Sequence, residues 1–122
     1  MKLWLLPGRY AVCRTPAPPA LTGTELEAVL SDKGGWTWVG PQANAPATGE
    51  CWPDWRALMV EGPLPFELTG VLARLSTPLA AAGVPVFALS TWSTDVLLVP
   101  AERLQDARAA LHAAGHELAD AP

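Results

Sequence analysis

Positive charge is scarce in this sequence and is not gathered into a patch. The 122 residues include 8 Lys and Arg against 12 Asp and Glu, which gives a formal net charge of −4. Nucleic-acid-binding surfaces need clustered basic residues, often interleaved with aromatic ones, and no such stripe occurs here. The composition therefore predicts a protein that does not bind nucleic acid.

Long hydrophobic runs are also missing. No apolar stretch approaches the roughly 20 residues that a bilayer-spanning helix needs. The apolar opening segment Met1–Leu6 is too short for a signal peptide, and Pro7-Gly8-Arg9 interrupts it before any cleavage site. We therefore predict no membrane association and a cytoplasmic location.

Cysteine and histidine are too few and too scattered for a metal site. Cys13 and Cys51 form no C-x-x-C motif and are predicted to be two ordinary buried thiols, without a disulfide framework. His112 and His116 are four apart, but Gly115 should end a helix between them and no third ligand follows. The sequence predicts no metal, no cofactor and no catalytic residue.

The composition is that of a globular protein with many residues that end helices and strands. Half of the residues are apolar, and 13 Pro and 10 Gly mark many boundaries. In the N-terminal part the patterns predict a strand at 9–13, a helix at 22–30, a strand at 36–39 and a mobile loop over 40–53. This part, residues 1–52, looks like a degenerate half of the unit that follows it in 53–122.

The C-terminal part begins with a predicted strand at 56–61 and a helix. Leu68, Val71, Leu72, Leu75 and Leu79 recur at steps of three and four, which places them on one helix face. Within that pattern Pro78 should kink or tighten the helix, and Gly83 supplies its C-terminal cap.

Two strands, a helix and a final strand complete the pattern. Residues 84–90 and 94–99 predict a β-hairpin, because only a few polar residues separate two apolar strands. The next helix opens at Pro100 and closes at Gly115, followed by a short strand at 116–118. Its expected inward residues are Leu104, Ala107, Leu111 and Ala114. The order β-α-β-β-α-β predicts an α+β, ferredoxin-like fold, an antiparallel sheet with both helices on one face.

A candidate ligand site lies where the first of these helices begins. The free N–H groups of a helix start suit a carboxylate, and Gly70 lets a ligand approach the backbone. Asp95, at the mouth of the hairpin, could bind a ligand ammonium or guanidinium group. The alternative is that Asp95 only hydrogen-bonds its own turn. Trp92, at the same hairpin, is the tryptophan most suited to contact a ligand.

These segments also carry a family resemblance. Glu61-Gly62-Pro63-Leu64, Leu68-Thr69-Gly70-Val71 and Ser90-Thr91 with Thr94-Asp95 resemble ACT-domain proteins related to the cytosolic arginine sensors. The opening segment Leu5–Cys13 is similar to the start of small bacterial tandem-ACT proteins of that group. Pro65 departs from the family pattern, which usually has an acidic residue there. The resemblance covers residues 3–13 and 55–117.

The resemblance implies a non-catalytic module that binds an amino acid between paired ACT units. The ligand backbone would be held at the first helix turn, and the ligand side chain would face the hairpin. Carried over by matching position, the implied ligand-binding residues are Gly62, Leu68, Thr69, Gly70, Val71, Ser90, Thr91, Thr94 and Asp95.

Three functional hypotheses follow. The first is an amino-acid sensor that acts as a homodimer or through a partner protein. The second is a protein-interaction module that has kept the fold and lost the ligand. The third is a thiol-dependent enzyme, which would need Cys13 or Cys51 exposed and beside a base.

Overall fold

The chain forms two compact units in the computed structural model, which describes residues 1–23, 25–65 and 67–122. The large unit contains Met1–Pro7 and Arg56–Pro122, and the small unit contains Gly8–Trp55. The first seven residues thus join the C-terminal part, which the sequence did not predict. The strands are β1 (Lys2–Leu5), β2 (Tyr10–Thr15), β3 (Ala28–Asp32), β4 (Gly35–Pro41), β5 (Glu50–Val60), β6 (Phe87–Ser90), β7 (Asp95–Pro100) and β8 (Glu117–Asp120). The helices are α1 (Val71–Ala81) and α2 (Leu104–Ala113), with 3-10 turns η1 (Gln42–Asn44) and η2 (Ala101–Arg103).

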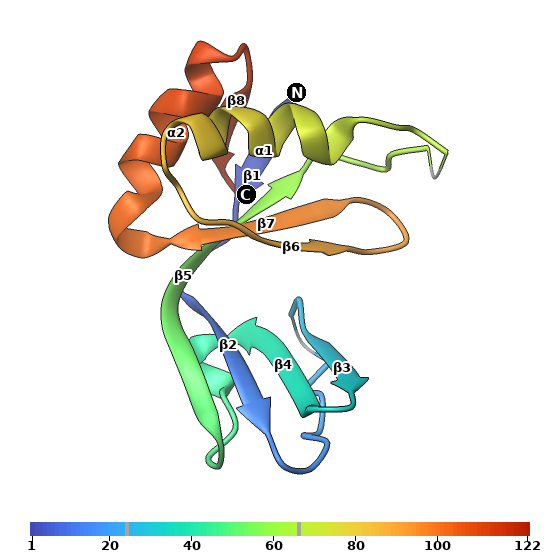
Figure 1. Cartoon of the computed structure of the whole chain (residues 1–122). Coiled ribbons are helices and arrows are strands. Elements are labelled where there is room, and N and C mark those ends of the chain that lie inside the picture. Colours follow the sequence, from blue (N-terminus) through green and yellow to red (C-terminus); the bar gives the residue numbers. More distant parts are fainter. Residues whose placement is uncertain (24, 66) are drawn as a thin grey trace. The chain divides into compact units, whose positions relative to one another are not determined.

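The large unit is a five-stranded sheet whose helices lie on one face (Figure 1). Its strand order is β6-β7-β5-β1-β8, and β5 contributes only its second half. This confirms the predicted ferredoxin-like order β5-α1-β6-β7-α2-β8. It also adds a strand that was not predicted, because β1 lies between β5 and β8. β1 is antiparallel to β5 and parallel to β8.

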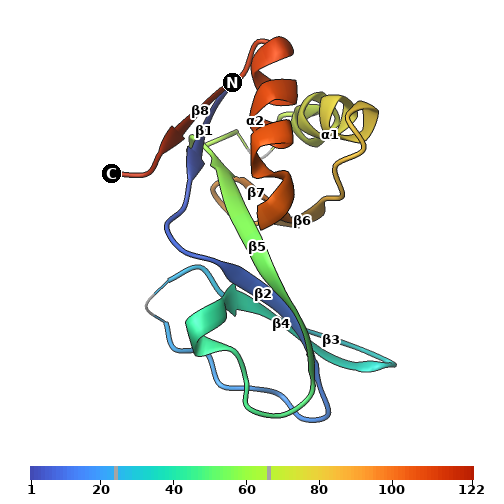
Figure 2. The same cartoon turned by 90° about the vertical axis from the view of Figure 1, so that its left-hand side faces the viewer.

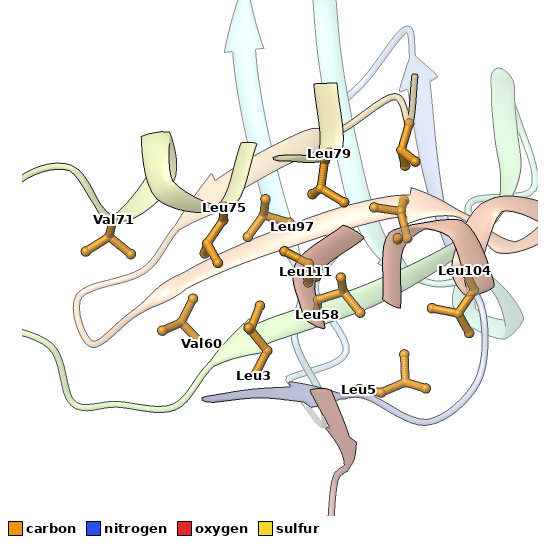
Figure 3. Close-up of a cluster of buried hydrophobic side chains, with 13 residues drawn as sticks. Leu3, Leu5, Leu58, Val60, Val71, Leu75, Leu79, Leu97, Leu104 and Leu111 are labelled. Atoms are coloured by element: carbon orange, nitrogen blue, oxygen red, sulfur yellow. The ribbon is translucent and has the colours of Figure 1, made fainter. Parts of the chain in front are cut away.

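The core of the large unit fills the space between this sheet and the two helices (Figure 3). Apolar residues that alternate along the strands meet apolar residues spaced by three or four along the helices. This cluster has thirteen buried members: Leu3, Leu5, Leu58, Val60, Val71, Leu75, Leu79, Val84, Leu97, Val99, Leu104, Ala107 and Leu111.

Helix α1 differs from its prediction in where it begins. It starts at Val71, so Leu68 lies before it and is exposed. Leu72 is also partly exposed, and the buried face is Val71, Leu75 and Leu79, at a spacing of four. The helix runs through Pro78 and ends at Ala81, with Ala82 as its C-cap, and Gly83 has the left-handed φ of +71° that was predicted.

In α2, Leu104, Ala107 and Leu111 are buried as predicted. Ala114 is exposed, contrary to the prediction, because α2 ends at Ala113 and Gly115 turns the chain into β8.

His116 is a buried structural residue beside Pro78. A proline at position 78 cannot donate to the carbonyl of residue 74, which is therefore left without its helical partner. The backbone of Arg74 instead hydrogen-bonds the His116 imidazole, whose Nδ1 also lies 2.9 Å from the Met1 amino group. Burial, followed by the charge of that amino group, lowers the pKa of His116.

The small unit is an antiparallel sheet of order β3-β4-β2-β5, with β5 contributing its first half (Figure 2). Strands β3 and β4 form a hairpin closed by the two residues Lys33 and Gly34. The Gly34 N–H donates to Asp32 Oδ1 across this turn at 2.6 Å. One buried cluster of this unit is Ala11, Cys13 and Trp38, with Val29 and Ala45 packed against them. Its other buried apolar residues among those described are Tyr10, Val12 and Val39.

Three predictions for this unit are wrong. The segment predicted as a helix at 22–30 ends in the strand β3, because Val29 and Leu30 pair with β4 across the tight turn. Within the same segment Glu27 does not act at a helix start. Its carboxylate accepts hydrogen bonds from Thr22, from the Gly23 N–H and from Trp38 Nε1.

The loop expected over 40–53 is also largely structured. β4 extends to Pro41, η1 follows, and β5 begins at Glu50. The Asp54 N–H donates to Gln42 Oε1 at 2.7 Å, and the Asp54 carboxylate forms an ion pair with Arg9 at 2.9 Å. These contacts join the two ends of the predicted loop.

The prediction of two free thiols is wrong as well. Cys13 and Cys51 occupy directly opposite positions on β2 and β5 and form a disulfide. Spacing along the sequence could not show this, because 38 positions separate the two cysteines and only the strand pairing brings them together.

Candidate functional site

Two segments of the large unit are joined at the place where α1 begins. The Leu64 N–H donates to the Ser93 carbonyl at 2.8 Å, and Thr94 Oγ1 donates to the Val60 carbonyl at 2.6 Å. Gly62 permits this approach, since a Cβ there would lie 3.0 Å from the Ser93 carbonyl oxygen. The loop after β5 and the tip of the β6–β7 hairpin therefore form one continuous wall.

The hairpin tip is ordered by Thr91. Its N–H donates to the Thr94 carbonyl at 2.8 Å, and its hydroxyl accepts the N–H groups of Ser93 and Thr94 at 3.2 and 3.1 Å. This is the hydroxyl-to-backbone bonding by which Thr stabilises tight turns. The turn presents Trp92 outward, with 84% of its surface exposed.

The start of α1 supplies the facing wall. The Leu68 N–H closes a turn onto the Pro65 carbonyl at 3.0 Å, and Gly70 caps the helix with a left-handed φ of +80°. That turn explains why the helix begins at Val71 and not near Leu68. No side chain caps the helix and its first turn has no acidic residue, so its N–H groups have no side-chain partner. Such a helix start carries the positive end of the helix dipole.

Between these walls lies a pocket of about 310 Å³. Of the residues predicted from the resemblance, it brings together Leu68, Gly70, Val71, Ser90, Thr91, Thr94 and Asp95, whereas Gly62 and Thr69 do not line it. Gly62 instead allows the loop after β5 to approach the hairpin tip at Ser93. The remaining lining residues are Leu64, Pro65, Leu72, Trp92 and Ser93. That any of them binds a ligand stays a prediction.

The chemistry of the pocket is polar on one wall and apolar on the other. Among the described residues that line it, Asp95 is the only ionisable one. Its Oδ1 accepts a hydrogen bond from Ser90 Oγ at 2.7 Å, across the hairpin, and its side chain is only partly buried. Asp95 therefore has a structural role within its own hairpin, through the Ser90 side chain and not through a backbone N–H, and its binding of a ligand stays a prediction. Asp95 keeps a second carboxylate oxygen, which a cationic group in the pocket can use.

Other site types find little support in the described part of the chain. It contains no group of three or more His, Cys, Asp or Glu residues placed to hold a metal ion. Both cysteines are in the disulfide, so neither offers the thiol that the enzyme hypothesis requires. None of its helices is both long and apolar enough to cross a membrane.

Solved structures resemble the whole chain. A crystal structure of an Agobacterium tumefaciens protein is 27% identical, with a TM-score of 0.88 over 99% of this chain and 93% of that one. A Vibrio cholerae protein of unknown function, described as a possible transport protein, is 24% identical, with a TM-score of 0.73 over 93% and 88% of the two chains. The fold is also that of the regulatory subunit of aspartate kinase from Thermus thermophilus, at 13% identity and a TM-score of 0.64 over 92% and 95% of the two chains.

The family model for the ACT domain matches residues 50–113. This match spans more than half of the chain and contains α1, the β6–β7 hairpin and α2. Every described residue that lines the pocket falls within the matched range. ACT domains are regulatory modules that typically bind amino acids. The chain belongs to the ACT-domain family.

Proposed function

We propose that this chain is a non-catalytic sensor that binds a free amino acid in the pocket between α1 and the β6–β7 hairpin. The observation that carries the proposal is the pairing of an uncapped helix start with a partly exposed carboxylate across one pocket. An amino acid carries the complementary pair of charges. Its α-carboxylate accepts from the N–H groups of the first turn of α1, and its ammonium group contacts Asp95.

The direct test is a thermal-shift panel of the twenty amino acids on the full chain. A ligand that binds only the folded state stabilises it by RT ln(1 + [L]/Kd), about 2.7 kcal/mol at a hundredfold excess over Kd. We expect saturable stabilisation by one amino acid or by one chemical class. A panel without any shift would contradict the proposal.

Variants of Asp95 test the cation end of the site. Asp95→Asn keeps the shape and removes the charge, and losing one charged hydrogen bond of about 1.5–3 kcal/mol weakens binding by at least about tenfold. Asp120→Asn, at the exposed last residue of β8, is the matched control and should bind like the native chain. Equal weakening in both variants would point to a general charge effect.

Variants of Leu72 test the carboxylate end. Leu72 is the second residue of α1, where proline is tolerated but donates no hydrogen bond. Leu72→Pro should therefore weaken binding more than Leu72→Ala, which removes the side chain and retains the N–H. Equal affinities of the two variants would show that this N–H is not used.

An interaction module without a ligand is the second candidate, and the pocket rim favours it. Among the described residues of the large unit, the exposed large apolar side chains are Leu68, Leu72 and Trp92, and all three line the pocket. Clustered exposed apolar residues mark binding surfaces. A second copy of the chain or a partner protein that covers this rim would fit either candidate, in keeping with a cytoplasmic regulatory role.

Sedimentation with and without each of the twenty amino acids separates the two candidates. The sensor hypothesis expects self-association or partner binding to change with ligand. The interaction hypothesis expects a complex that forms equally well in both conditions.

A further inference from the structure

The disulfide of the small unit joins a buried cysteine to an exposed one. Cys13 on β2 is 1% exposed and belongs to the core, whereas Cys51 on β5 is exposed. All of the first five residues of β5, Glu50–Asp54, are exposed. The disulfide can therefore be reached from solvent at Cys51 and is shielded at Cys13.

The small unit buries few apolar side chains. Among its described residues six are buried, with Cys13 one of them, against sixteen in the large unit. A unit of this size buries too small a fraction of its surface for a core alone to suffice, so such units commonly rely on cross-links. The bridge closes a loop that contains β3, β4 and η1, which makes up most of the unit.

We infer that the Cys13–Cys51 disulfide is a thiol-exchange site, at which an external thiol controls the folding of residues 8–55 while the large unit stays folded. The co-reactant is a low-molecular-weight monothiol or dithiol. The geometry selects Cys51 as the sulfur that is attacked, because attack on a disulfide requires access to the sulfur from the side away from its partner.

The exchange proceeds in two balanced steps. A thiolate RS⁻ bonds to Cys51 Sγ, the bond between Cys13 and Cys51 breaks, and its electron pair leaves on Cys13 Sγ, which takes up a proton. A second thiolate then attacks the R sulfur and releases Cys51 as a thiolate. Overall the protein disulfide is reduced to two thiols and two external thiols are oxidised to RSSR.

The exchange is reversible because of strand register. Cys13 and Cys51 are directly opposite one another, with Cα atoms 4.0 Å apart, whenever β2 and β5 are paired. A disulfide oxidant such as oxidised glutathione therefore re-forms the bridge when the unit folds. Folding and oxidation of the small unit are thus coupled.

Hydrogen exchange on the full chain, with and without dithiothreitol under native conditions, tests this inference. Reduction should increase amide exchange in β2 and β4 by about a hundredfold or more, and leave β7 and α2 unchanged. Adding oxidised glutathione should restore the protection. Unchanged protection in β2 and β4 after complete reduction, or an equal loss in both units, would overturn the inference.

The double variant Cys13→Ser with Cys51→Ser is the matched control. It should exchange like the reduced chain and show no response to dithiothreitol. A response of this variant as large as that of the native chain would also overturn the inference, since the reductant would then act elsewhere.

The site of attack is tested by limiting glutathione followed by peptide mass mapping. The mixed disulfide should be found on Cys51 at least about tenfold more often than on Cys13. Equal modification of both cysteines, or modification mainly of Cys13, would refute the proposed direction of attack.

Discussion

The two units of this chain are stabilised by different means. The large unit has two helices that cover one face of its sheet, and thirteen buried apolar residues between them. In its described residues the small unit has no α-helix and six buried apolar residues, supplemented by a disulfide and by the hydrogen bonds of Glu27. A sheet without helices to cover it buries less area, and cross-links compensate for the difference.

The largest expected effect is on the small unit. Replacing both cysteines, as Cys13→Ser with Cys51→Ser, removes a bridge across 38 positions, and the loop-entropy relation gives a loss of about 4 kcal/mol. Denaturant unfolding followed by hydrogen exchange would assign this loss to residues 8–55. A double variant as stable as the oxidised native chain would show that the small unit does not depend on its disulfide.

The next effect is on the large unit. Leu75 in α1 is fully buried, and Leu75→Ala should lower the free energy of unfolding by about 3 kcal/mol, since it removes buried methyl groups and leaves a cavity. Leu30→Ala is the control, because Leu30 on β3 is 53% exposed. Similar losses from the two substitutions would mean that the core assignment is wrong.

A smaller effect on the large unit follows from pH. The pKa of His116 is lowered in the folded state, so the unfolded state binds the proton more readily. The stability associated with neutral His116 is fully present at pH values above 6.5, the ordinary pKa of histidine, and is lost as pH falls below that value. In thermal melts between about pH 8 and pH 5, the midpoint temperature should fall more steeply with pH in the native chain than in His116→Gln. Equal pH dependence of the two proteins would show that His116 is not the group responsible.

The smallest effect concerns the small unit at lower pH. Hydrogen bonds from Thr22, and then from the Gly23 N–H and Trp38, lower the pKa of Glu27. Its contribution is present above the ordinary carboxyl value of 4.5 and is lost as pH falls below it. The protection factors of the β4 amides, which correct for the intrinsic pH dependence of exchange, should therefore fall at acid pH in the native chain and be nearly insensitive to acid in Glu27→Gln. If the variant responds to acid like the native chain, another group controls this unit.

The same contrast explains how much could be predicted from the sequence. In the large unit, periodicity was strong over α1, α2 and the β6–β7 hairpin, and these elements were predicted with boundary shifts of a few residues. The helix start was misplaced, because Leu68 continues the apolar period although Gly70 and the turn from Pro65 delay the helix. β1 was missed because its pairing with β5 and β8 is long-range.

In the small unit the determining interactions are not local. Helical spacing in 22–30 was overridden by pairing with β4, and the disulfide depends on strand register. Most of the candidate site could be predicted, because Leu68, Gly70, Val71, Ser90 and Asp95 lie in the two segments that the resemblance singled out. The places of Leu64, Ser93 and Gly62 followed only from the contact between those segments.

The most direct test of a ligand site in the large unit is an amide chemical-shift titration of the full chain with the amino acid that stabilises it in the thermal-shift panel. We predict saturable shifts at Val71, Leu72 and Asp95, with the amides of β2 and β4 unmoved. Saturable shifts centred on residues 8–55, with α1 and the β6–β7 hairpin silent, would contradict the assignment of the ligand site to the large unit.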